Sequence, residues 1–463
     1  MGVQIRELAG KRVLVAGAGV SGLAAADALI ALGAEVTVTD SDPGKLEAVP
    51  APATSVVGLD RPPSETVLIV TSPGWHPDTP LLADAVAAGV EVIGEPELAR
   101  RWGSADAAGR GMSPPTWLAV TGTNGKTTTV GMLEQVLRAA GQDAVACGNI
   151  GLPVITAVRA RHRVLAVELS SFQLHWCPDL RPVAGCVLNL ADDHLDWHGT
   201  VGEYQSAKAR VLTGEIGVAV VDDPGAAALL AAAPAPRKIG VTLGEPADGQ
   251  LGVVDGALVD YAFSDTPIEL ARIDDVRPAG PPGLTDALAA TALARAHGVE
   301  PDAVQQGLHR YEPDRHRAEP VATVAGVEFV DDSKATNPHA ANASLSAHPR
   351  VVWIAGGLLK GARVDDLVAA HRERLVGAVL LGADQEVIAE ALARHAPDVP
   401  VAQVGAGDDA PMSQAVRLAA GMARPGDVVL LAPAAASLDQ FPDYRARGRA
   451  FAAAVGELRS ARR

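Results

Sequence analysis

Short apolar runs rich in Val, Ile and Leu alternate along this chain with longer stretches rich in Ala and Leu. Such runs are typical of strands buried in a parallel sheet, and the Ala-rich stretches between them favour crossover helices. The first unit of the pattern predicts a strand at 12–16, a glycine-rich turn, a helix to about residue 32 and a strand at 35–39. With a further strand predicted at 67–70, this region is expected to be an α/β domain.

Two more series of the same kind follow. The second starts at "WLAVTGTNGKTTT" and includes a predicted hairpin in "LGVVDGALVD", where Asp255-Gly256 suits a tight turn. The third starts after "YEPDRHR". A small, polar stretch, "GSADAAGRGMSPP" at 103–115, predicts a linker. The expected elements are strands at 117–120, 163–169, 184–190, 218–221, 327–331, 351–355, 377–381, 399–404 and 427–431, and helices near 285–297 and 301–310. Three α/β domains are therefore predicted, at 1–110, 111–314 and 315–463.

Length and composition agree with several domains and exclude some classes of function. A chain of 463 residues is too long for one ordinary core, and its 48% apolar content supports globular packing. The net charge of −16 argues against a nucleic-acid-binding surface. Cys147, Cys177 and Cys186 form no C-x-x-C pair and no metal-ligand spacing, so free thiols in a reducing compartment are expected. The sequence begins without an apolar export segment and has no apolar run approaching ~20 residues, so a cytoplasmic protein without a membrane partner is predicted.

The stretch "VAGAGVSGLAAA" at 15–26 matches the G-x-G-x-x-G pattern of a dinucleotide-binding turn through Gly17, Gly19 and Gly22. Asp40 follows Gly22 by eighteen residues, where a dehydrogenase would bind a ribose. The pattern is weakly specific, and by itself it leaves a nicotinamide-dependent reductase open.

The stretch "VTGTNGKTTT" is a sharper signal, because a predicted strand leads through a glycine-rich turn into a helix that starts near Lys126. Backbone amides of such a turn bind phosphate, Lys126 can reach the terminal phosphates, and Thr127 can ligate Mg²⁺. The spacing is shorter than a strict Walker A motif, since Val120 occupies the place of its first glycine. The predicted ATP-binding residues here are Gly122, Thr123, Asn124, Gly125, Lys126, Thr127 and Thr128.

Polar residues follow the neighbouring predicted strands, at the edge where open parallel sheets bind ligands. Glu168 closes one strand and is a candidate Mg²⁺ ligand. The stretch "ADDHLDWHG" places His194 and His198 at a spacing of four residues, which zinc could use, but Mg²⁺ beside a phosphate loop explains more. Lys208 lies on a predicted helix and by itself is expected at the surface.

The order of these motifs resembles that of the Mur ligases. The resemblance is carried by "GTNGKTTT", "GNIG", "ELSSFQL", "LNLADDHLDWHG", "HR" at 316–317, "DDSKATN" and "LAPAAASLDQF", and it covers essentially the whole chain. It implies an N-terminal Rossmann-like domain for a UDP-sugar, a central phosphate-loop ATPase domain with a parallel sheet, and a C-terminal Rossmann-like domain for the incoming amino acid. The glycine turn at 17–22 would then bind the diphosphate of the UDP-sugar rather than a dinucleotide.

The resemblance is strongest to the branch that adds D-glutamate to UDP-N-acetylmuramoyl-L-alanine. It implies an ADP-forming ligase that works through an acyl phosphate in a cytoplasmic step of peptidoglycan precursor synthesis, and so serves cell wall biogenesis, cell shape and cell division. A monomer is expected. A relative that adds L-glutamate or uses another nucleotide-peptide acceptor stays open.

The resemblance also implies roles for individual residues. Glu168 and His194 match metal ligands, and Lys208 matches a lysine that becomes carbamylated and then helps to hold Mg²⁺; with Lys126 these form the expected catalytic set. Arg317 and Asp332 match contacts to ATP, and Lys334 lies in the same loop as Asp332. The expected UDP-sugar contacts are Val20, Ser21, Asp40, Ser41, Ser72, Gly74, Asn149, Ser170 and Gln173. The expected amino-acid contacts are Thr336, Lys360, Ser437, Leu438 and Tyr444, of which Lys360 suits a side-chain carboxylate.

Two departures from the family pattern stand out. In "GPPGLTDALAA" the pair expected near adenine is replaced by Pro282 and Gly283, and a second Asn is replaced by Asp286, so adenine binding is expected to differ. Ala435 stands where a Cys is common, which is expected to be harmless. Because of this altered stretch, the alternative that the chain is a non-catalytic member of the family stays open. A folylpolyglutamate synthase would lack the UDP-binding unit, so the "GAGVSG" turn counts against it.

Overall fold

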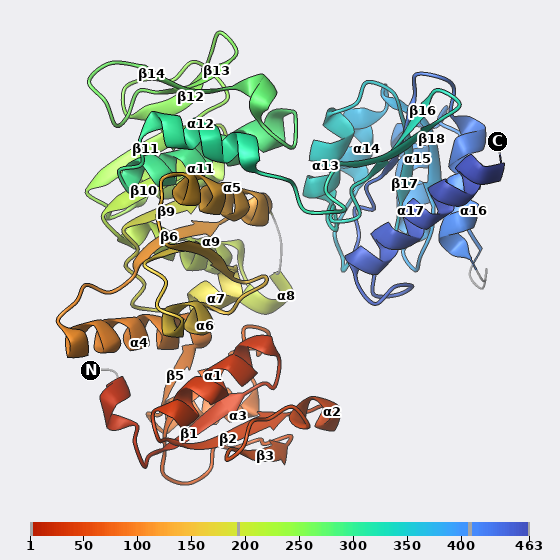
Figure 1. The fold of residues 1–463 in the computed structure, drawn as a ribbon. Helices are drawn as coiled ribbons and strands as arrows, with labels where there is room; N and C mark the ends of the chain where they lie inside the picture. The colour runs from red at the N-terminus through yellow and green to blue at the C-terminus, as the bar shows by residue number, and fades with distance from the viewer. Residues whose placement is uncertain (1–2, 192–194, 406–409, 462–463) are drawn as a thin grey trace. The chain divides into compact units, whose positions relative to one another are not determined.

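The computed structural model describes residues 3–191, 195–405 and 410–461. In this part of the chain the strands form three sheets, and the residues divide into two compact units (Figure 1). The first unit comprises residues up to 277 together with 283–311 and contains the first two sheets. The second unit comprises 278–282 and the residues from 312 onward and contains the third sheet.

The first sheet has the strand order β3-β2-β1-β4-β5, and all of its neighbouring strands are parallel. Its strands are β1 (Arg12–Ala16), β2 (Glu35–Asp40), β3 (Thr54–Val57), β4 (Thr66–Thr71) and β5 (Glu91–Gly94). Because β1 has β2 on one side and β4 on the other, the order reverses at β1. A crevice for a ligand forms at such a point, outside the carboxyl ends of the strands.

The second sheet has the order β14-β13-β12-β11-β10-β9-β6-β8-β7. Its strands are β6 (Thr116–Thr121), β7 (Ala144–Gly148), β8 (Val164–Glu168), β9 (Ala184–Val187), β10 (Ile216–Val220), β11 (Arg237–Val241), β12 (Gln250–Val254), β13 (Ala257–Asp260) and β14 (Ile268–Arg272). The predicted hairpin is confirmed: β12 and β13 are antiparallel, and Asp255 (φ 48°) and Gly256 (φ 73°) make the left-handed turn between them. The order reverses at β6, which lies between β8 and β9.

The third sheet has the order β15-β16-β20-β17-β18-β19, in which only the pair β15–β16 is antiparallel among the described strands. Its strands are β15 (Glu319–Val324), β16 (Val327–Asp331), β17 (Val351–Ala355), β18 (Leu375–Leu380), β19 (Val401–Gln403) and β20 (Val428–Leu431). Trp353 is fully buried in β17, where its indole donates to the Ala432 carbonyl oxygen at 2.7 Å.

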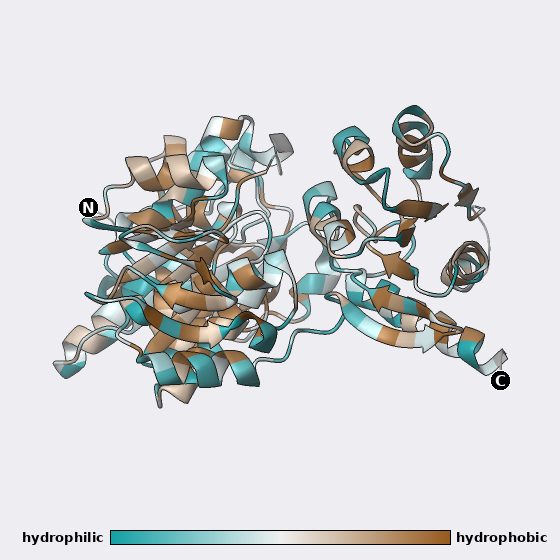
Figure 2. Cartoon of the chain, turned by 90° about the horizontal axis from the view of Figure 1, so that it is seen from above, coloured by the Kyte–Doolittle hydropathy of each residue, from teal (hydrophilic) through white to brown (hydrophobic). Residues whose placement is uncertain are grey.

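Helices connect the strands, as parallel sheets require. In the first unit they are α1 (Val20–Ala31), α2 (Pro43–Leu46), α3 (Pro80–Ala87), α4 (Glu95–Arg110), α5 (Lys126–Ala139), α6 (Val154–Arg159), α7 (Ser171–His175), α8 (Leu195–His198), α9 (Val201–Ala209), α10 (Pro224–Ala232), α11 (Pro281–Ala296, apart from its first two residues) and α12 (Pro301–Arg310). In the second unit they are α13 (Pro338–Ser346), α14 (Asp365–His371), α15 (Gln385–His395), α16 (Pro411–Met422) and α17 (Tyr444–Ala461). Figure 2 shows strands that are mainly hydrophobic and helices that carry both hydrophobic and hydrophilic residues.

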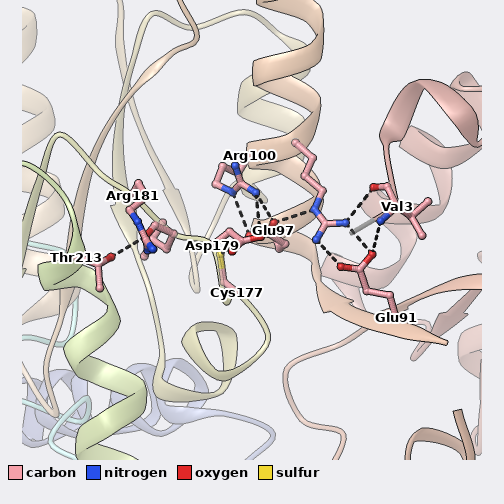
Figure 3. Close-up of polar contacts among 10 residues, drawn as sticks. Val3, Glu91, Glu97, Arg100, Cys177, Asp179, Arg181 and Thr213 are labelled. Atoms are coloured by element: carbon pink, nitrogen blue, oxygen red, sulfur yellow. Dashed lines mark hydrogen bonds and ion pairs between the residues drawn. The ribbon is translucent and has the colours of Figure 1, made fainter. Parts of the chain in front are cut away.

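The predicted linker at 103–115 is wrong over most of its length, because residues up to Arg110 belong to α4. Small residues there serve packing: a Cβ at Gly103 would lie 3.2 Å from Pro115 Cδ. The buried Glu97 of α4 accepts hydrogen bonds from Arg100 and Arg101, and Arg101 also pairs with Glu91 of β5 at 2.7 Å (Figure 3). Burial opposes ionisation of Glu97, but its arginine partners hold its pKa below the usual value. The helix thus supports a polar junction within the first unit.

No helix in the described ranges is long and apolar enough to cross a membrane.

Candidate functional site

A glycine-rich turn joins β1 to α1 where the order of the first sheet reverses. Gly17 has φ 103°, and a Cβ at Gly22 would lie 1.9 Å from the Gly17 carbonyl oxygen, so both positions require glycine. Within the described chain no side chain caps the first turn of α1. An uncapped helix N-terminus behind a glycine turn favours an anionic ligand.

Two predicted contact residues support this turn. The Asp40 carboxylate accepts hydrogen bonds from the amides of Ala18 (2.9 Å) and Asp42 (3.0 Å), and the Ser72 hydroxyl donates to the Gly17 carbonyl oxygen (3.3 Å). Burial opposes ionisation of Asp40, but the amide donors hold its pKa below the usual value. The other predicted contacts lie at the same edge of the sheet: Val20 and Ser21 in α1, Ser41 after β2, and Gly74 after β4.

The second glycine-rich loop connects β6 to α5 at the reversal point of the second sheet. Gly122 has φ 158° and a Cβ there would lie 2.9 Å from Leu188 Cβ, while Gly125 has φ 88°. Lys126 is the first residue of α5, as predicted, and the Thr129 amide donates to the Gly125 carbonyl oxygen at 3.0 Å. The loop and the helix N-terminus together make a backbone cradle suited to phosphate.

Asn189 and Tyr204 hold this loop, and neither is among the residues predicted from the sequence. Asn189 follows β9, and its Oδ1 accepts from the amides of Thr123 (3.0 Å) and Asn124 (2.9 Å). The Tyr204 hydroxyl lies 2.9 Å from the Thr123 hydroxyl. Asn189 could have been predicted, because it is a polar residue directly after the apolar strand in "VLNL". No comparable pattern in the sequence indicates a role for Tyr204.

Two lysines donate to one backbone oxygen of the loop. Lys126 Nζ lies 2.8 Å and Lys208 Nζ 2.7 Å from the Gly122 carbonyl oxygen, and Lys126 also donates to the Thr123 carbonyl oxygen at 2.9 Å. Lys208 is only 2% exposed, and its ammonium lies 4.8 Å from the ring centroid of Tyr204. The surface position expected for this lysine on its own is therefore wrong. Two cations converge on a loop whose backbone suits phosphate.

Glu168 ends β8, beside the phosphate loop strand, and is buried. Asn149 Nδ2 donates to Glu168 Oε1 at 3.0 Å, and the Asn149 amide donates to the Glu168 carbonyl oxygen at 2.9 Å. A Cβ at Gly148 would lie 2.0 Å from that carbonyl oxygen, so the approach of the two residues requires glycine. Two predicted site residues are thus brought into direct contact.

Ser170 and Gln173 form a capping box at the start of α7. Gln173 is buried, and its Nε2 has no hydrogen-bond partner among the residues that the structure describes. An unpaired buried amide is costly, so this donor is an exception to the usual pairing of buried polar groups. His194 lies outside the described residues. His198 is buried with its Nε2 2.8 Å from the Ser171 hydroxyl.

The stretch that departs from the family pattern lies within α11 rather than ahead of it, with Pro282 and Gly283 in the first turn. Asp286 is buried, and its Oδ1 accepts from the Thr129 hydroxyl at 3.2 Å. A Cβ at Gly125 would lie 2.3 Å from the same carboxylate oxygen. Asp286 therefore packs directly against the phosphate loop and the start of α5.

In the second compact unit, the residues predicted to bind the amino acid follow the carboxyl ends of three adjacent strands. Leu358 and Ala436 exchange backbone hydrogen bonds of 2.8 and 2.9 Å, which join the loops after β17 and β20. The Lys334 ammonium lies 4.2 Å from the ring centroid of Tyr444. The predicted residues are Thr336 after β16, Lys360 after β17, Ser437 and Leu438 after β20, and Tyr444 at the start of α17.

The segment that carries Arg317 is tied to the loop after β16. His316 Nδ1 lies 2.7 Å from Asp331 Oδ2, and the Lys334 amide donates to the His316 carbonyl oxygen at 3.2 Å. His316, Glu319 and Asp331 could together offer atoms to a metal ion, but Asp331 already pairs with His316. The next residue, Asp332, accepts from the Ser344 hydroxyl, and burial raises the pKa of Asp332.

A buried arginine, which the sequence did not reveal, connects these loops. Arg447 is 1% exposed and donates to the carbonyl oxygens of Ser333 (2.9 Å) and Ala435 (3.1 Å) and to the Ser333 hydroxyl (3.0 Å). Burial lowers the pKa of Arg447 to about 10. Since its donors bind the loops after β16 and β20, this side chain fixes the edge at which the predicted amino-acid contacts lie.

Three family models match successive parts of the chain. They describe a Mur ligase MurD-like N-terminal domain at 11–94, a Mur ligase middle domain at 120–264, and a Mur ligase glutamate ligase domain at 316–435. The matched segments correspond to the three sheets, and the phosphate loop lies in the middle one.

Individual relatives match over nearly the whole length. A UDP-N-acetylmuramoylalanine–D-glutamate ligase of Nocardia farcinica is 55% identical, with 97% of each chain covered, and a protein of the same name from Rhodococcus jostii is 53% identical, with 97% of this chain and 96% of the relative covered. Among solved structures, the UDP-N-acetylmuramate-alanine ligase of Thermotoga maritima gives a TM-score of 0.58 at 16% identity over 97% of this chain and 99% of the other. The MurF ligase from the same organism, solved in complex with ADP, gives 0.56 at 18% identity over 100% and 98%. The agreement of sheets, glycine loops and sequence over the full length leads to one conclusion: this chain belongs to the Mur ligase family.

Proposed function

We propose that this protein is an ADP-forming ligase that adds D-glutamate to UDP-N-acetylmuramoyl-L-alanine in peptidoglycan precursor synthesis. The observation that carries the proposal is the convergence of Lys126 and the buried Lys208 on the backbone of a phosphate loop, in a chain 55% identical to a named D-glutamate ligase. The domains then take the boundaries predicted from the sequence: 1–110 for the UDP-sugar, 111–314 for ATP and 315–463 for the amino acid.

ATP would place its phosphate tail against the amides of residues 122–128. The loop carbonyls of Gly122 and Thr123 now accept from Lys126, so its ammonium is held at the loop, within reach of a phosphate tail bound there. Moving from two carbonyl oxygens to phosphate oxygens exchanges neutral acceptors for charged ones, which form the stronger hydrogen bonds. We assign Arg317 and Asp332 to the same nucleotide, through phosphate and ribose respectively.

Mg²⁺ fits the residues near this loop. The Glu168 carboxylate is buried and, in the residues that the structure covers, receives a hydrogen bond only at Oε1, so Oε2 is available as a hard oxygen ligand. The ion would be held by Glu168, the Thr127 hydroxyl and His194, with Lys208 joining when carbamylated. Bound there, it would neutralise phosphate charge during transfer. Carbamylation of Lys208 would replace a buried cation with an anion that can join the ligands of Mg²⁺.

The UDP-sugar would lie along the first glycine turn, with its diphosphate at the N-terminus of α1. Its alanyl arm would extend toward Asn149, Ser170 and Gln173, where the unpaired Gln173 Nε2 offers a donor. D-glutamate would bind to the loops that Arg447 holds together, with Lys360 pairing with a carboxylate and Thr336, Ser437, Leu438 and Tyr444 shaping the pocket.

The reaction then follows in two steps. The carboxylate of the alanyl arm attacks the γ-phosphorus of ATP, and the bond from that phosphorus to the bridging oxygen breaks. ADP is the leaving group, and the alanyl arm now carries an acyl phosphate. The amine of D-glutamate attacks the acyl carbon, a C–N bond forms, the C–O bond to phosphate breaks, and the amine loses a proton. The Lys126 ammonium offsets part of the charge of the two anions as they approach each other, and alignment by the backbone cradle supplies much of the rate enhancement.

The test is phosphate release from ATP in the presence of UDP-N-acetylmuramoyl-L-alanine, with D-glutamate compared against L-glutamate, L-lysine and meso-diaminopimelate. Release that depends on the nucleotide-sugar and on D-glutamate supports the proposal. Preference for L-glutamate would assign the chain to a relative with the other stereochemistry. An absence of ATP consumption with any amino acid would refute the ligase function and favour a non-catalytic relative.

A further inference from the structure

The loop after β4 brings an indole onto the first glycine turn. The sequence Ser72-Pro73-Gly74-Trp75 forms a reverse turn, closed by a hydrogen bond from the Trp75 amide to the Ser72 carbonyl oxygen at 3.2 Å. The Ser72 amide in turn donates to the Ala16 carbonyl oxygen at 2.7 Å, at the end of β1. The reverse turn is therefore anchored beside the residue at which the glycine turn begins.

The approach of Trp75 can be measured from Gly17. A Cβ at Gly17 would lie 2.9 Å from the Trp75 indole nitrogen and 2.5 Å from the Ser72 hydroxyl oxygen. The polar edge of the indole, rather than its benzene ring, thus faces the glycine turn. The ring is half-buried against an apolar cluster that includes Leu14, Ile69 and Trp176. The apolar part of the side chain is packed, and its one polar atom lies at the ligand edge.

This indole N–H has no acceptor in the described part of the chain, whereas three donors next to it are satisfied. The Gly17 amide donates to the Thr39 carbonyl oxygen (2.7 Å), and the Ala18 amide donates to Asp40. The Ser72 hydroxyl donates to the Gly17 carbonyl oxygen. Trp75 therefore offers a hydrogen-bond donor that the protein itself does not use, next to an uncapped helix N-terminus.

The loop is also held at its other side. The His76 ring meets the Trp197 ring edge-on, with centroids 5.7 Å apart, and the Asp78 amide lies 3.2 Å from His76 Nδ1. The Thr79 hydroxyl donates to the His76 carbonyl oxygen at 2.9 Å. These contacts place the indole before any ligand arrives, so little conformational entropy is lost when it binds one.

We propose that Trp75 is a binding residue of this site, whose indole N–H donates to a diphosphate oxygen of the nucleotide-sugar. The inference rests on the proposed function and adds a ligand contact to it. A diphosphate at the N-terminus of α1 presents charged oxygens next to Gly17, and Gly17 carries no side chain that could separate them from the indole. A tryptophan gives one N–H and no acceptor, so the contact requires a hydrogen-bond acceptor, which a diphosphate oxygen supplies.

The test compares Trp75→Phe, which keeps an aromatic ring and removes the N–H, with Trp75→Ala, which removes both. Trp102→Phe is the matched control, because Trp102 is another half-buried tryptophan, on α4, with Arg159 rather than the glycine turn against its ring. Binding of UDP and of uridine is measured by calorimetry. The KM values for UDP-N-acetylmuramoyl-L-alanine, ATP and D-glutamate are measured by phosphate release.

A hydrogen bond to a charged oxygen accounts for about tenfold or more in affinity. Trp75→Phe is therefore expected to weaken UDP binding and raise the KM for the nucleotide-sugar by about tenfold, with the uridine affinity, the other KM values and Tm unchanged. Trp102→Phe should match the wild type. An unchanged UDP affinity in Trp75→Phe, or an equal loss for UDP and uridine, would overturn the donor role. If the wild-type chain bound UDP in this pattern but formed no amide, the proposed reaction would fail while this contact stood.

Discussion

Replacing Gly125 by alanine tests how the phosphate loop and α11 depend on each other. Gly125 combines a left-handed backbone, φ 88° and ψ −22°, with a neighbour that leaves no room for a side chain. The new Cβ would lie 2.3 Å from Asp286 Oδ1 and 3.0 Å from Leu188 Cδ1. Both the loop and the buried carboxylate must then move.

The expected cost has two parts. An alanine in the left-handed region costs about 1–2 kcal/mol, and overpacking a buried contact costs about 1–3 kcal/mol more. Gly125→Ala should therefore destabilise the protein by about 2–5 kcal/mol. Gly141 supplies the control, since it has φ 74° and nothing within 4 Å of its Cβ position. Gly141→Ala should show the backbone part alone, about 1–2 kcal/mol.

The assay is equilibrium urea unfolding, together with the KM for ATP. The transition to follow is the one whose urea midpoint rises when ATP is added. Asp286→Ala removes the obstructing carboxylate, so the double variant Gly125→Ala/Asp286→Ala should recover about 1–3 kcal/mol relative to the sum of the single effects. Gly125→Ala should also raise the KM for ATP at least tenfold, because the amides that face phosphate shift with the loop. Equal destabilisation by Gly125→Ala and Gly141→Ala, or additive single effects, would refute the contact.

Three further outcomes are expected. Lys126→Ala should lower phosphate release at least a hundredfold, because no other group of the loop takes over a charge aimed at the phosphate tail; appreciable turnover would contradict the assignment. Burial raises the pKa of Glu95 from its ordinary 4.5 to about 7, although the Ile155 amide donates to it. The folded state therefore holds this proton longer than the unfolded state, and stability is lost as pH rises from about 4.5 to 7. Between pH 5 and pH 8 the free energy of unfolding, measured by urea titration, should fall by about 3 kcal/mol less in Glu95→Gln than in the wild type. An equal fall in both proteins would contradict this prediction. The three thiols are buried, and their pKa values are raised by burial, so Ellman's reagent should find none in the folded protein and all three after denaturation.

Much of the architecture could be predicted from local pattern. The strands at 12–16, 327–331 and 351–355 coincide with β1, β16 and β17, because each is a short apolar run bounded by turn residues. The start of α5 at Lys126 and the hairpin at Asp255-Gly256 were also predicted, since both depend on neighbouring residues. Predictions failed where local composition misled: the small, polar residues at 103–110 continue α4 rather than forming a linker.

The sequence by itself determined the phosphate loop and the first glycine turn, because their chemistry resides in consecutive residues whose spacing can be read along the chain. Only the tertiary structure decided which distant residues serve them. Lys208 lies 86 positions from Gly122, to whose carbonyl oxygen it donates. Asp286 lies 157 positions from Thr129, from whose hydroxyl it accepts a hydrogen bond. Trp75 reaches the glycine turn in the same way, through the pairing of β4 with β1. Contacts of this kind depend on strand order and on which face of a helix is buried, and short stretches of sequence do not encode either.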